Sequence, residues 1–210
     1  MCVIGTASYD GEADLPPLVE RAVELARSMR FPFSCHPAQG RLLALLAQGR
    51  PAGLIGETGT GCGVGLAWVA TAADAAARLV SIERDAARAE AVRALFASDE
   101  RVEVLSGDWP ALLEHGPFDL LVLDGGGSGK VIGDTQVDPP AALRCGGSLV
   151  IDDWTPWDSW PPRERGEFDG VQGSREHLDR ARLHWLQHPD LLASEVRLTA
   201  TLSTIVAMRR

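Results

Sequence analysis

The sequence of 210 residues lacks the features that define several protein classes. It contains no apolar run of membrane-spanning length, and its start has no basic region followed by a long apolar core, so we expect neither a membrane protein nor a secreted one. Positive charge is also scarce, with 20 basic against 29 acidic residues and a net charge of −9. This excess of negative charge argues against non-specific binding to nucleic acid or to an anionic membrane.

Cysteine and lysine are both rare. The four cysteines, Cys2, Cys35, Cys62 and Cys145, form no CxxC pair, which argues against a disulfide framework and a structural zinc. We therefore expect a cytoplasmic protein with reduced thiols. Lys130 is the only lysine, and in so Ala- and Gly-rich a chain we attribute this to coding bias and not to chemistry.

Helical and strand patterns alternate along the chain, which indicates βαβ units and a parallel sheet. The prediction is an α/β protein with a doubly wound, mostly parallel seven-stranded sheet, Rossmann-like, closed by a C-terminal antiparallel hairpin. Residues 1–50 would supply N-terminal helices and a covering loop packed on a core of residues 51–210, in a single domain. Expected strands are 53–57, 79–83, 101–107, 118–124, 146–153 and two within 194–210; expected helices are 16–29, 41–48, 65–77, 84–98, 109–115 and 174–189.

A glycine-rich turn follows the first expected strand, with Glu57 two residues before Gly59. The dinucleotide fingerprint GxGxxG is not met, since the third glycine is Gly63, one position early, and Val64 occupies its place. A carboxylate here would also repel phosphate. An acidic residue beside such a turn favours a cationic ligand, an ammonium with a sulfonium nearby.

The segment E57-T58-G59-T60-G61-C62-G63 resembles the first motif of class I S-adenosylmethionine-dependent methyltransferases. The resemblance covers most of the chain and narrows to the catechol-type and bacterial O-methyltransferases, on the segments HPAQGRLLALLA, SIERD, SGDWPALL, FDLLVLD and GGSLVIDDW and on the closing hairpin. It implies that Glu57 holds the methionine ammonium, directly or through water, and that Glu83 accepts from both ribose hydroxyls. It further implies cofactor contacts from Gly59, Thr60, Gly61, Gly63, Asp108 (to the adenine amino group), Trp109 or Arg84 (to the adenine face) and Asp124.

The resemblance also implies a divalent metal, Mg²⁺ or else Mn²⁺ or Ca²⁺, on Asp124, Asp152 and Asp153, because hard oxygen ligands suit these ions. A structural alternative is that Asp124 orders the cofactor side and the Asp152-Asp153 pair caps the following turn. The sequence departs from the family here: Asp153 stands in place of an Asn, and Gly127 stands in place of the lysine that acts as general base.

Two residues are candidates for the missing base. Lys130 lies further along the same glycine loop and would have to swing back, and His36 falls in the segment that covers the cofactor in relatives. His36 is equally consistent with an ordinary loop histidine. His177, His184 and His188, on or after a late helix, are expected at the surface.

The acceptor is expected to lie against Trp154 and Trp157, in and beside the Pro-, Gly- and Trp-rich segment 155–173, because aromatic walls fit a flat phenolic substrate. These tryptophans are equally consistent with packing of that segment on the domain or with a homodimer contact.

The sequence therefore predicts an S-adenosylmethionine-dependent O-methyltransferase for a small, aromatic hydroxylated acceptor. Two alternatives stay open: a NAD-dependent oxidoreductase, and a non-catalytic S-adenosylmethionine-binding regulatory protein. A nucleic-acid substrate is a minority reading, because the chain has no basic cluster.

Overall fold

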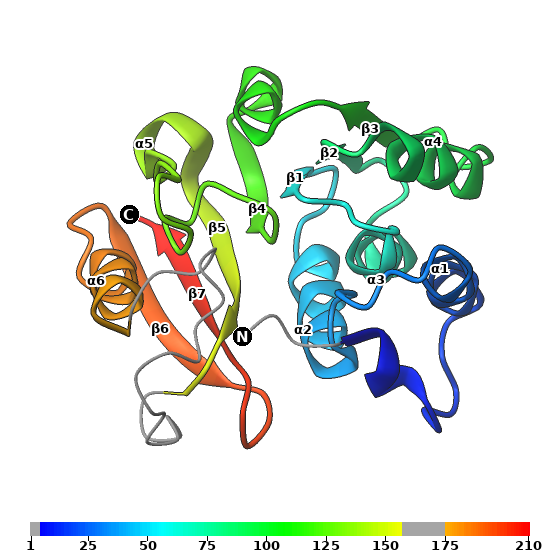
Figure 1. Ribbon diagram of the computed structural model, residues 1–210. Helices are drawn as coiled ribbons and strands as arrows, with labels where there is room; N and C mark the ends of the chain where they lie inside the picture. Colours follow the sequence, from blue (N-terminus) through cyan, green and yellow to red (C-terminus); the bar gives the residue numbers. More distant parts are fainter. Residues whose placement is uncertain (1–4, 157–174) are drawn as a thin grey trace.

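The computed structural model describes residues 5–156 and 175–210, and within them seven strands form one sheet in the order β3-β2-β1-β4-β5-β7-β6 (Figure 1). The strands β1 to β5 run parallel, and β7 pairs antiparallel with both β5 and β6. This confirms the predicted doubly wound, mostly parallel sheet with its C-terminal hairpin. The strands are β1 (Leu54–Thr58), β2 (Arg78–Glu83), β3 (Val102–Ser106), β4 (Phe118–Leu123), β5 (Leu143–Trp154), β6 (Leu191–Arg197) and β7 (Ser203–Arg209).

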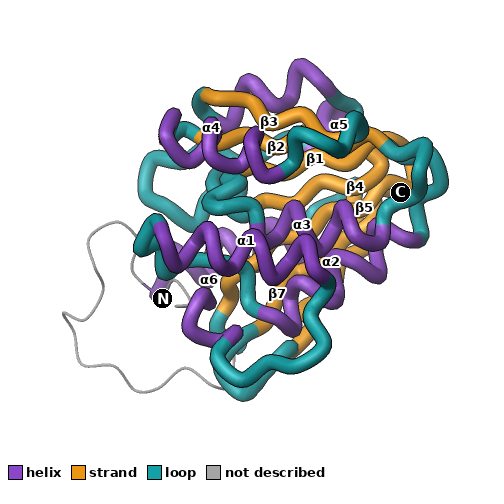
Figure 2. Tube along the Cα trace, turned by 90° about the vertical axis from the view of Figure 1, so that its right-hand side faces the viewer, coloured by secondary structure: helices purple, strands orange, loops and turns teal. Residues whose placement is uncertain are grey.

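Helices cover both faces of the sheet (Figure 2). The buried side chains of α1 to α4 share one hydrophobic cluster with one face, and those of α5, α6 and the 3₁₀ segment η2 share a second cluster with the other. The N-terminal helices α1 and α2 thus pack on α3, the helix that follows the glycine turn. The helical segments are η1 (Gly5–Tyr9), α1 (Pro17–Ser28), α2 (Pro37–Gln48), α3 (Val64–Ala72), α4 (Ala86–Leu95), η2 (Trp109–His115), α5 (Pro139–Ala142) and α6 (Arg175–Leu186).

The strand β4 shows why the sheet is buried on both sides. Leu120 and Val122 belong to the cluster under α1 to α4, whereas Leu121 and Leu123 belong to the cluster under η2, α5 and α6. Successive side chains of a strand point to opposite faces, so a strand covered on both faces reads as one continuous apolar run.

Several elements differ from the sequence predictions, and four of the differences are as follows. The helix α2 begins at Pro37 and not at residue 41, because His36 caps it: Nδ1 of His36 accepts from the amide of Ala38 (3.1 Å). The helix α3 ends at Ala72 instead of continuing to residue 77. Residues 109–115 form a 3₁₀ helix, and β5 begins three residues earlier than predicted, at Leu143.

The glycine turn after β1 brings two backbone segments into contact. Gly59 has φ +81°, and a Cβ built on it would lie 2.4 Å from Cα of Gly125, the second residue after β4. Glycine is therefore required at position 59 by its conformation and by this close approach. The contact fixes the spacing between the turns that follow β1 and β4.

None of the helices in the two described ranges is both long enough and apolar enough to cross a membrane.

Candidate functional site

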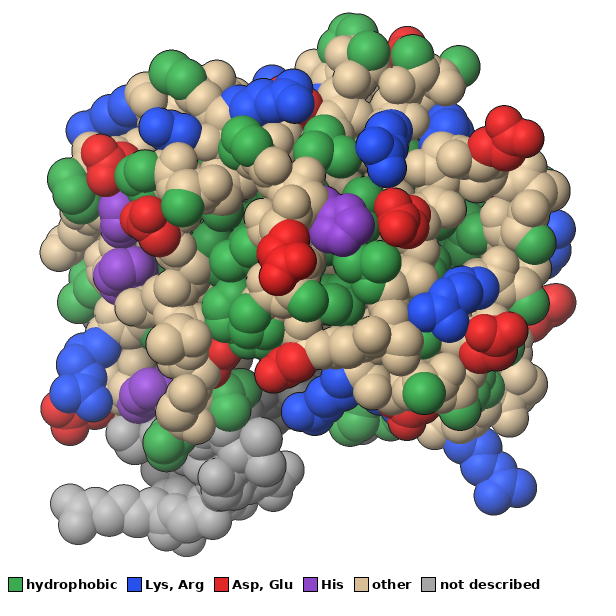
Figure 3. Space-filling view, turned by 90° about the horizontal axis from the view of Figure 1, so that it is seen from above, with side chains coloured by type: hydrophobic (Ala, Val, Ile, Leu, Met, Phe, Trp, Pro, Cys, Tyr) green, Lys and Arg blue, Asp and Glu red, His purple; other side chains and the backbone are tan. Residues whose placement is uncertain are grey.

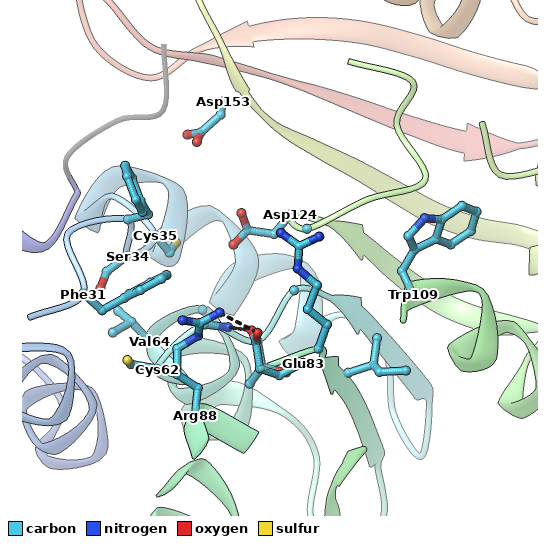
Figure 4. Close-up of a pocket in the computed structure, with 18 of the residues that line it drawn as sticks. Phe31, Ser34, Cys35, Cys62, Val64, Glu83, Arg88, Trp109, Asp124 and Asp153 are labelled. Atoms are coloured by element: carbon cyan, nitrogen blue, oxygen red, sulfur yellow. Dashed lines mark hydrogen bonds and ion pairs between the residues drawn. The ribbon is translucent and has the colours of Figure 1, made fainter. Parts of the chain in front are cut away.

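A cavity of about 280 Å³ lies at the carboxyl ends of the parallel strands (Figure 4). This is the edge of a doubly wound sheet at which ligands bind. The residues that line the cavity come from the turns after β1, β2, β3 and β4, from the end of β5 and from the segment before α2. The predicted cofactor residues among them are Gly59, Thr60, Gly61, Glu83, Arg84, Asp108, Trp109 and Asp124.

The carboxylate of Glu83, at the end of β2, is held by three donors and is 5% exposed. Its Oε2 accepts from the amide of Gly61 (2.8 Å), and its Oε1 accepts from the amide of Asp85 and from Nη2 of Arg88 (2.9 Å each). The ion pair with Arg88 is visible in Figure 4. Arg88 was not predicted from the sequence; a basic residue one helical turn after the N-cap Asp85 is the only signal for it.

Glu57 lies beneath the cavity and does not line it, and it is 4% exposed. Its Oε2 accepts from the hydroxyl of Ser81 (2.5 Å), which is also hydrogen-bonded to the hydroxyl of Thr60 (2.5 Å). A Cβ at position 65 would lie 2.7 Å from Oε1 of Glu57, so Gly65 leaves room for this carboxylate. Burial raises the pKa of Glu57 from 4.5 to about 7, although the hydrogen bond from Ser81 lowers it.

The third glycine of the motif serves the fold more than the cavity. Gly63, with φ +82°, is the N-cap of α3, and a Cβ there would lie 3.0 Å from the side chain of Val92 and 3.2 Å from that of Phe96. It is not among the residues that line the cavity. A larger side chain at this position would push against α4.

The predicted adenine residues follow β3. Asp108 caps η2 by accepting from the amide of Trp109 (3.0 Å), and both residues line the cavity. Figure 4 shows Trp109 on the opposite side of the cavity from Phe31, with Glu83 between them. Trp109 is placed by the loop after β4, because a Cβ on Gly126 would lie 2.4 Å from its ring.

Three carboxylates meet at the ends of β4 and β5. One oxygen from each of Asp124, Asp152 and Asp153 lies within 4.8 Å of the others. Burial, and then the charge of Asp152, raises the pKa of Asp124 well above its usual range. Asp153 has φ +48°, a left-handed conformation that Asp tolerates better than most residues, and its carboxylate faces the cavity in Figure 4.

Lys130 is part of this carboxylate cluster. Its Nζ donates to the backbone carbonyl of Asp152 (2.8 Å) and to Oδ1 of the same residue (3.1 Å). Lys130 does not line the cavity, and its side chain is 13% exposed. Burial lowers the pKa of Lys130, but the charges of Asp152 and Asp153 outweigh burial and raise it above its usual value. Lys130 is therefore held at Asp152 and is not placed as a base that swings freely over the acceptor.

The fit of a divalent metal can be judged from the same contacts. Three carboxylates are the donor chemistry that Mg²⁺ prefers. One oxygen of Asp152 is, however, already bound by the Lys130 ammonium, which also lies in the field of Asp153 and Asp124. The cluster thus contains a cation of its own, which competes with a divalent metal for Asp152.

Two further predicted residues, His36 and Trp154, do not line the cavity. His36 caps α2 through Nδ1 and does not line the cavity. Trp154 is 2% exposed and packs in the core, with Nζ of Lys130 and the guanidinium of Arg182 5.6 and 5.1 Å from its ring centroid, so it presents no open wall to an acceptor. Trp157 lies outside the described residues.

Aromatic residues before α2 line the cavity and were not predicted. The rings of Phe31 and Phe33 meet edge to face with centroids 5.8 Å apart, and the guanidinium of Arg88 lies 5.2 Å from the centroid of Phe31. Phe33 remains 52% exposed. The only sequence signal for them was the aromatic pair in the segment RFPFSC, directly before a helix that packs on the sheet.

Comparison with known proteins supports the fold described above. Residues 57–154 match the model of a family described as a methyltransferase domain. No curated protein matches the chain. Among solved structures, the chain is similar to cofactor-bound Rv0187 from MTB, with 22% identity, a TM-score of 0.75, and 96% of this chain and 94% of the other covered.

Two further structures are named O-methyltransferases. The enzyme from Bacillus cereus in complex with SAH has 19% identity and a TM-score of 0.71, with 99% and 97% of the two chains covered. TomG from Streptomyces achromogenes, involved in tomaymycin synthesis and in complex with SAM, has 21% identity and a TM-score of 0.71, with 98% and 95% covered.

These likenesses establish the fold over nearly the whole chain, and the family match covers its core from Glu57 to Trp154. The predicted Rossmann-like methyltransferase fold is thereby confirmed.

Proposed function

We propose that the protein transfers the methyl group of S-adenosylmethionine to a hydroxyl oxygen of a small, aromatic acceptor. One observation carries this proposal: a single cavity joins the glycine turn and the carboxylates Glu83 and Asp108 to a second carboxylate group, Asp124 and Asp153, at its other end. The first set suits a cofactor with ribose, adenine and an ammonium. The second set suits the hydroxyl that is to be methylated.

The cofactor end is assigned residue by residue. Glu83, already fixed by Gly61 and Arg88, presents a carboxylate for the two ribose hydroxyls, and such a group rejects a 2′-phosphate. Asp108 accepts from the adenine amino group, with Trp109 or Arg84 at the adenine face. The buried Glu57 supplies negative charge beneath the methionine ammonium, which it would hold directly or through water.

The transfer itself is a displacement at carbon. The acceptor oxygen attacks the methyl carbon, the bond from that carbon to sulfur breaks, and the sulfonium leaves as the neutral thioether of S-adenosylhomocysteine. The hydroxyl proton passes to the carboxylate of Asp153, which reaches the cavity. Positioning the two reactants in line supplies most of the acceleration.

The acceptor is assigned to small molecules on charge and aromaticity. The net charge is −9, and Figure 3 shows acidic and basic side chains interspersed over the face seen from above. A nucleic acid would need a continuous basic surface. Phe31 and Phe33 offer aromatic contacts at the cavity to a flat phenolic ring. A cytoplasmic location, with reduced thiols, is part of the same proposal.

Two measurements test this function. Isothermal calorimetry should detect binding of S-adenosylhomocysteine and no binding of NAD or NADP at millimolar concentration. Tight binding of NAD or NADP would instead indicate an oxidoreductase. A panel of phenols and catechols should then yield methylated product. If cofactor binds and only a nucleic acid or a protein is methylated, the acceptor is wrongly assigned. If cofactor binds and no acceptor turns over, the protein is a cofactor-binding regulator.

A further inference from the structure

The three clustered carboxylates at the acceptor end of the cavity repel one another when they are ionised, and this repulsion has to be compensated in the folded protein. Asp124, Asp152 and Asp153 each place an oxygen within 4.8 Å of the others, and Asp152 is only 5% exposed. Like charges at such separations disfavour ionisation of the whole group unless a cation or a proton intervenes. The question is which positive charge this chain uses.

Lys130 supplies such a charge from within the chain. Its ammonium donates to both the carbonyl oxygen and the carboxylate Oδ1 of Asp152, at 2.8 and 3.1 Å, and both side chains of this ion pair are largely buried. The ammonium therefore lies where the negative potential of the cluster is concentrated.

The loop that carries Lys130 is fixed by contacts that do not involve the cluster. The carboxylate of Asp134 accepts from the amides of Gly127 and Gly129 (3.0 Å each to Oδ2), which closes the glycine-rich turn on itself. From α6, Nε1 of Trp185 donates to the carbonyl of Ser128 (2.8 Å). Lys130 is thus held at Asp152 by an ordered loop, and no swing of a glycine segment is needed to bring it there.

We propose that the Lys130 ammonium is the resident cation of the Asp124–Asp152–Asp153 cluster, and that it excludes the divalent ion which these carboxylates would otherwise bind. The inference rests on the proposed function only in placing the cluster at the acceptor end. Lys130 acts as a positioning residue: it neutralises Asp152 and orients the cluster, and methyl transfer proceeds without a divalent metal.

Binding of Mn²⁺ tests the proposal without any need for turnover. Chelator-treated full-length protein is titrated with Mn²⁺, and free ion is followed by electron paramagnetic resonance, for the wild type, Lys130→Gln, Lys130→Arg and the double variant Lys130→Gln/Asp124→Asn. The matched control is Arg144→Gln, which removes one positive charge from an exposed ion pair with Asp119 on β4, near the opposite end of the sheet.

The expected result is a gain of binding in one variant. Lys130→Gln should bind Mn²⁺ about 10-fold more tightly than the wild type or more, because a unit charge has been removed at close range. Lys130→Arg and Arg144→Gln should behave like the wild type, and Asp124→Asn in the double variant should abolish the gain. Equal affinity of the wild type and Lys130→Gln, whether tight or absent, overturns the proposal.

A second measurement keeps the proposal testable if Lys130→Gln fails to fold. The wild type alone should keep its activity and its affinity for S-adenosylhomocysteine in excess EDTA. Activity lost on chelation and restored by Mg²⁺ overturns the resident-cation proposal and leaves the methyltransferase proposal standing. If S-adenosylhomocysteine does not bind at all, the proposed function is wrong. The Mn²⁺ titration still tests whether Lys130 is the resident cation of the cluster.

Discussion

The amide of Gly61, in the turn after β1, donates a hydrogen bond of 2.8 Å to Oε2 of Glu83 at the end of β2. The glycine turn and the carboxylate that we propose binds the ribose are therefore one unit, in which each part fixes the other. Arg88 completes it from α4 by its ion pair with Oε1 of Glu83. The cofactor end of the cavity is thus ordered before any ligand arrives, which reduces the entropy lost on binding.

Replacing Glu83 should weaken cofactor binding. Glu83→Gln removes a charge-assisted contact and should cost about 1–3 kcal/mol of affinity for S-adenosylmethionine, measured by calorimetry. The matched control is Glu103→Gln on the neighbouring strand β3, whose carboxylate makes an exposed ion pair with Arg78. Unchanged affinity in the Glu83 variant, with the fold intact by circular dichroism, would remove Glu83 from the binding site.

The buried Glu57 should make the stability of the ligand-free protein depend on pH. Its folded pKa is about 7 against 4.5 for the free group, so the folded state holds the proton more tightly than the unfolded state. The stabilisation is complete below about pH 4.5 and is lost as the pH rises through 7, by up to about 3 kcal/mol.

The variant Glu57→Gln, which cannot ionise, should lack this dependence. Denaturant unfolding of both proteins between pH 5 and 8 should show the wild type losing stability relative to the variant as the pH rises. A difference between the two that stays constant over this range would mean that Glu57 is ionised in the fold, contrary to its burial.

The close approach of Gly59 to Gly125 should make position 59 intolerant of any side chain. Gly59→Ala has to adopt a positive φ and also place its Cβ 2.4 Å from Cα of Gly125, so one of the two turns has to move. Gly11→Ala is the matched control, because Gly11 has nearly the same φ (+84°) and a Cβ built on it meets no atom of the described residues within 4 Å.

The control should lose only the backbone term, roughly 1–2 kcal/mol of unfolding free energy. Gly59→Ala should lose clearly more than that, and its affinity for S-adenosylhomocysteine should fall as well. Equal losses of stability in the two variants would show that the turns after β1 and β4 are not in forced contact.

The fold and half of the site could be predicted because they follow from local patterns. The alternation of strands and helices defined the sheet. Because the carboxyl ends of parallel strands meet at one edge, their order along the chain was enough to group Glu83, Asp108, Asp124 and Asp153. Ser81 was missed although it is a polar residue in a buried strand, since its partnership with Glu57 depends on the register of β1 against β2.

Other features depend on packing between distant segments, and the sequence carries little trace of them. The start of α2 at Pro37 was missed because a histidine cap is unusual. Lys130 was expected to swing on a flexible loop, but that loop is fixed by Asp134 and by Trp185 from α6. Trp154 was expected in an open wall, yet the cations of Lys130 and Arg182 lie close to its ring in the core.

The fully buried Arg182 should contribute strongly to stability. Its guanidinium donates to both oxygens of Glu195 (2.7 and 2.6 Å) and to the carbonyl of Thr155 (2.5 Å). Arg182→Met leaves the Glu195 carboxylate without this partner and should lower the unfolding free energy by about 3–5 kcal/mol. Arg144→Met, in an exposed ion pair, should cost at most about 1 kcal/mol. Similar shifts of the thermal midpoint in both variants would contradict this.

The last prediction concerns Phe33, which lines the cavity while remaining 52% exposed. A large apolar side chain left open to solvent at a cavity is suited to a ligand that covers it, and a second aromatic ring would gain about 0.5–1.5 kcal/mol from stacking or edge contact. Phe33→Ala should therefore raise KM for a phenolic acceptor by about 3- to 10-fold. It should leave the affinity for S-adenosylhomocysteine unchanged, since Phe31 and not Phe33 lies against Gly61 and Arg88.

The control for Phe33→Ala is Leu45→Ala, an equally apolar truncation at a residue of α2 that is 65% exposed and does not line the cavity. Steady-state kinetics with the acceptor varied and the cofactor saturating, together with calorimetry of S-adenosylhomocysteine, separate the two ends of the site. If cofactor affinity falls in step with the rise in KM, Phe33 belongs to the cofactor end of the cavity. If KM does not change, the acceptor ring lies elsewhere, and the aromatic contact that holds it has to come from another wall of the cavity, such as that formed by Trp109.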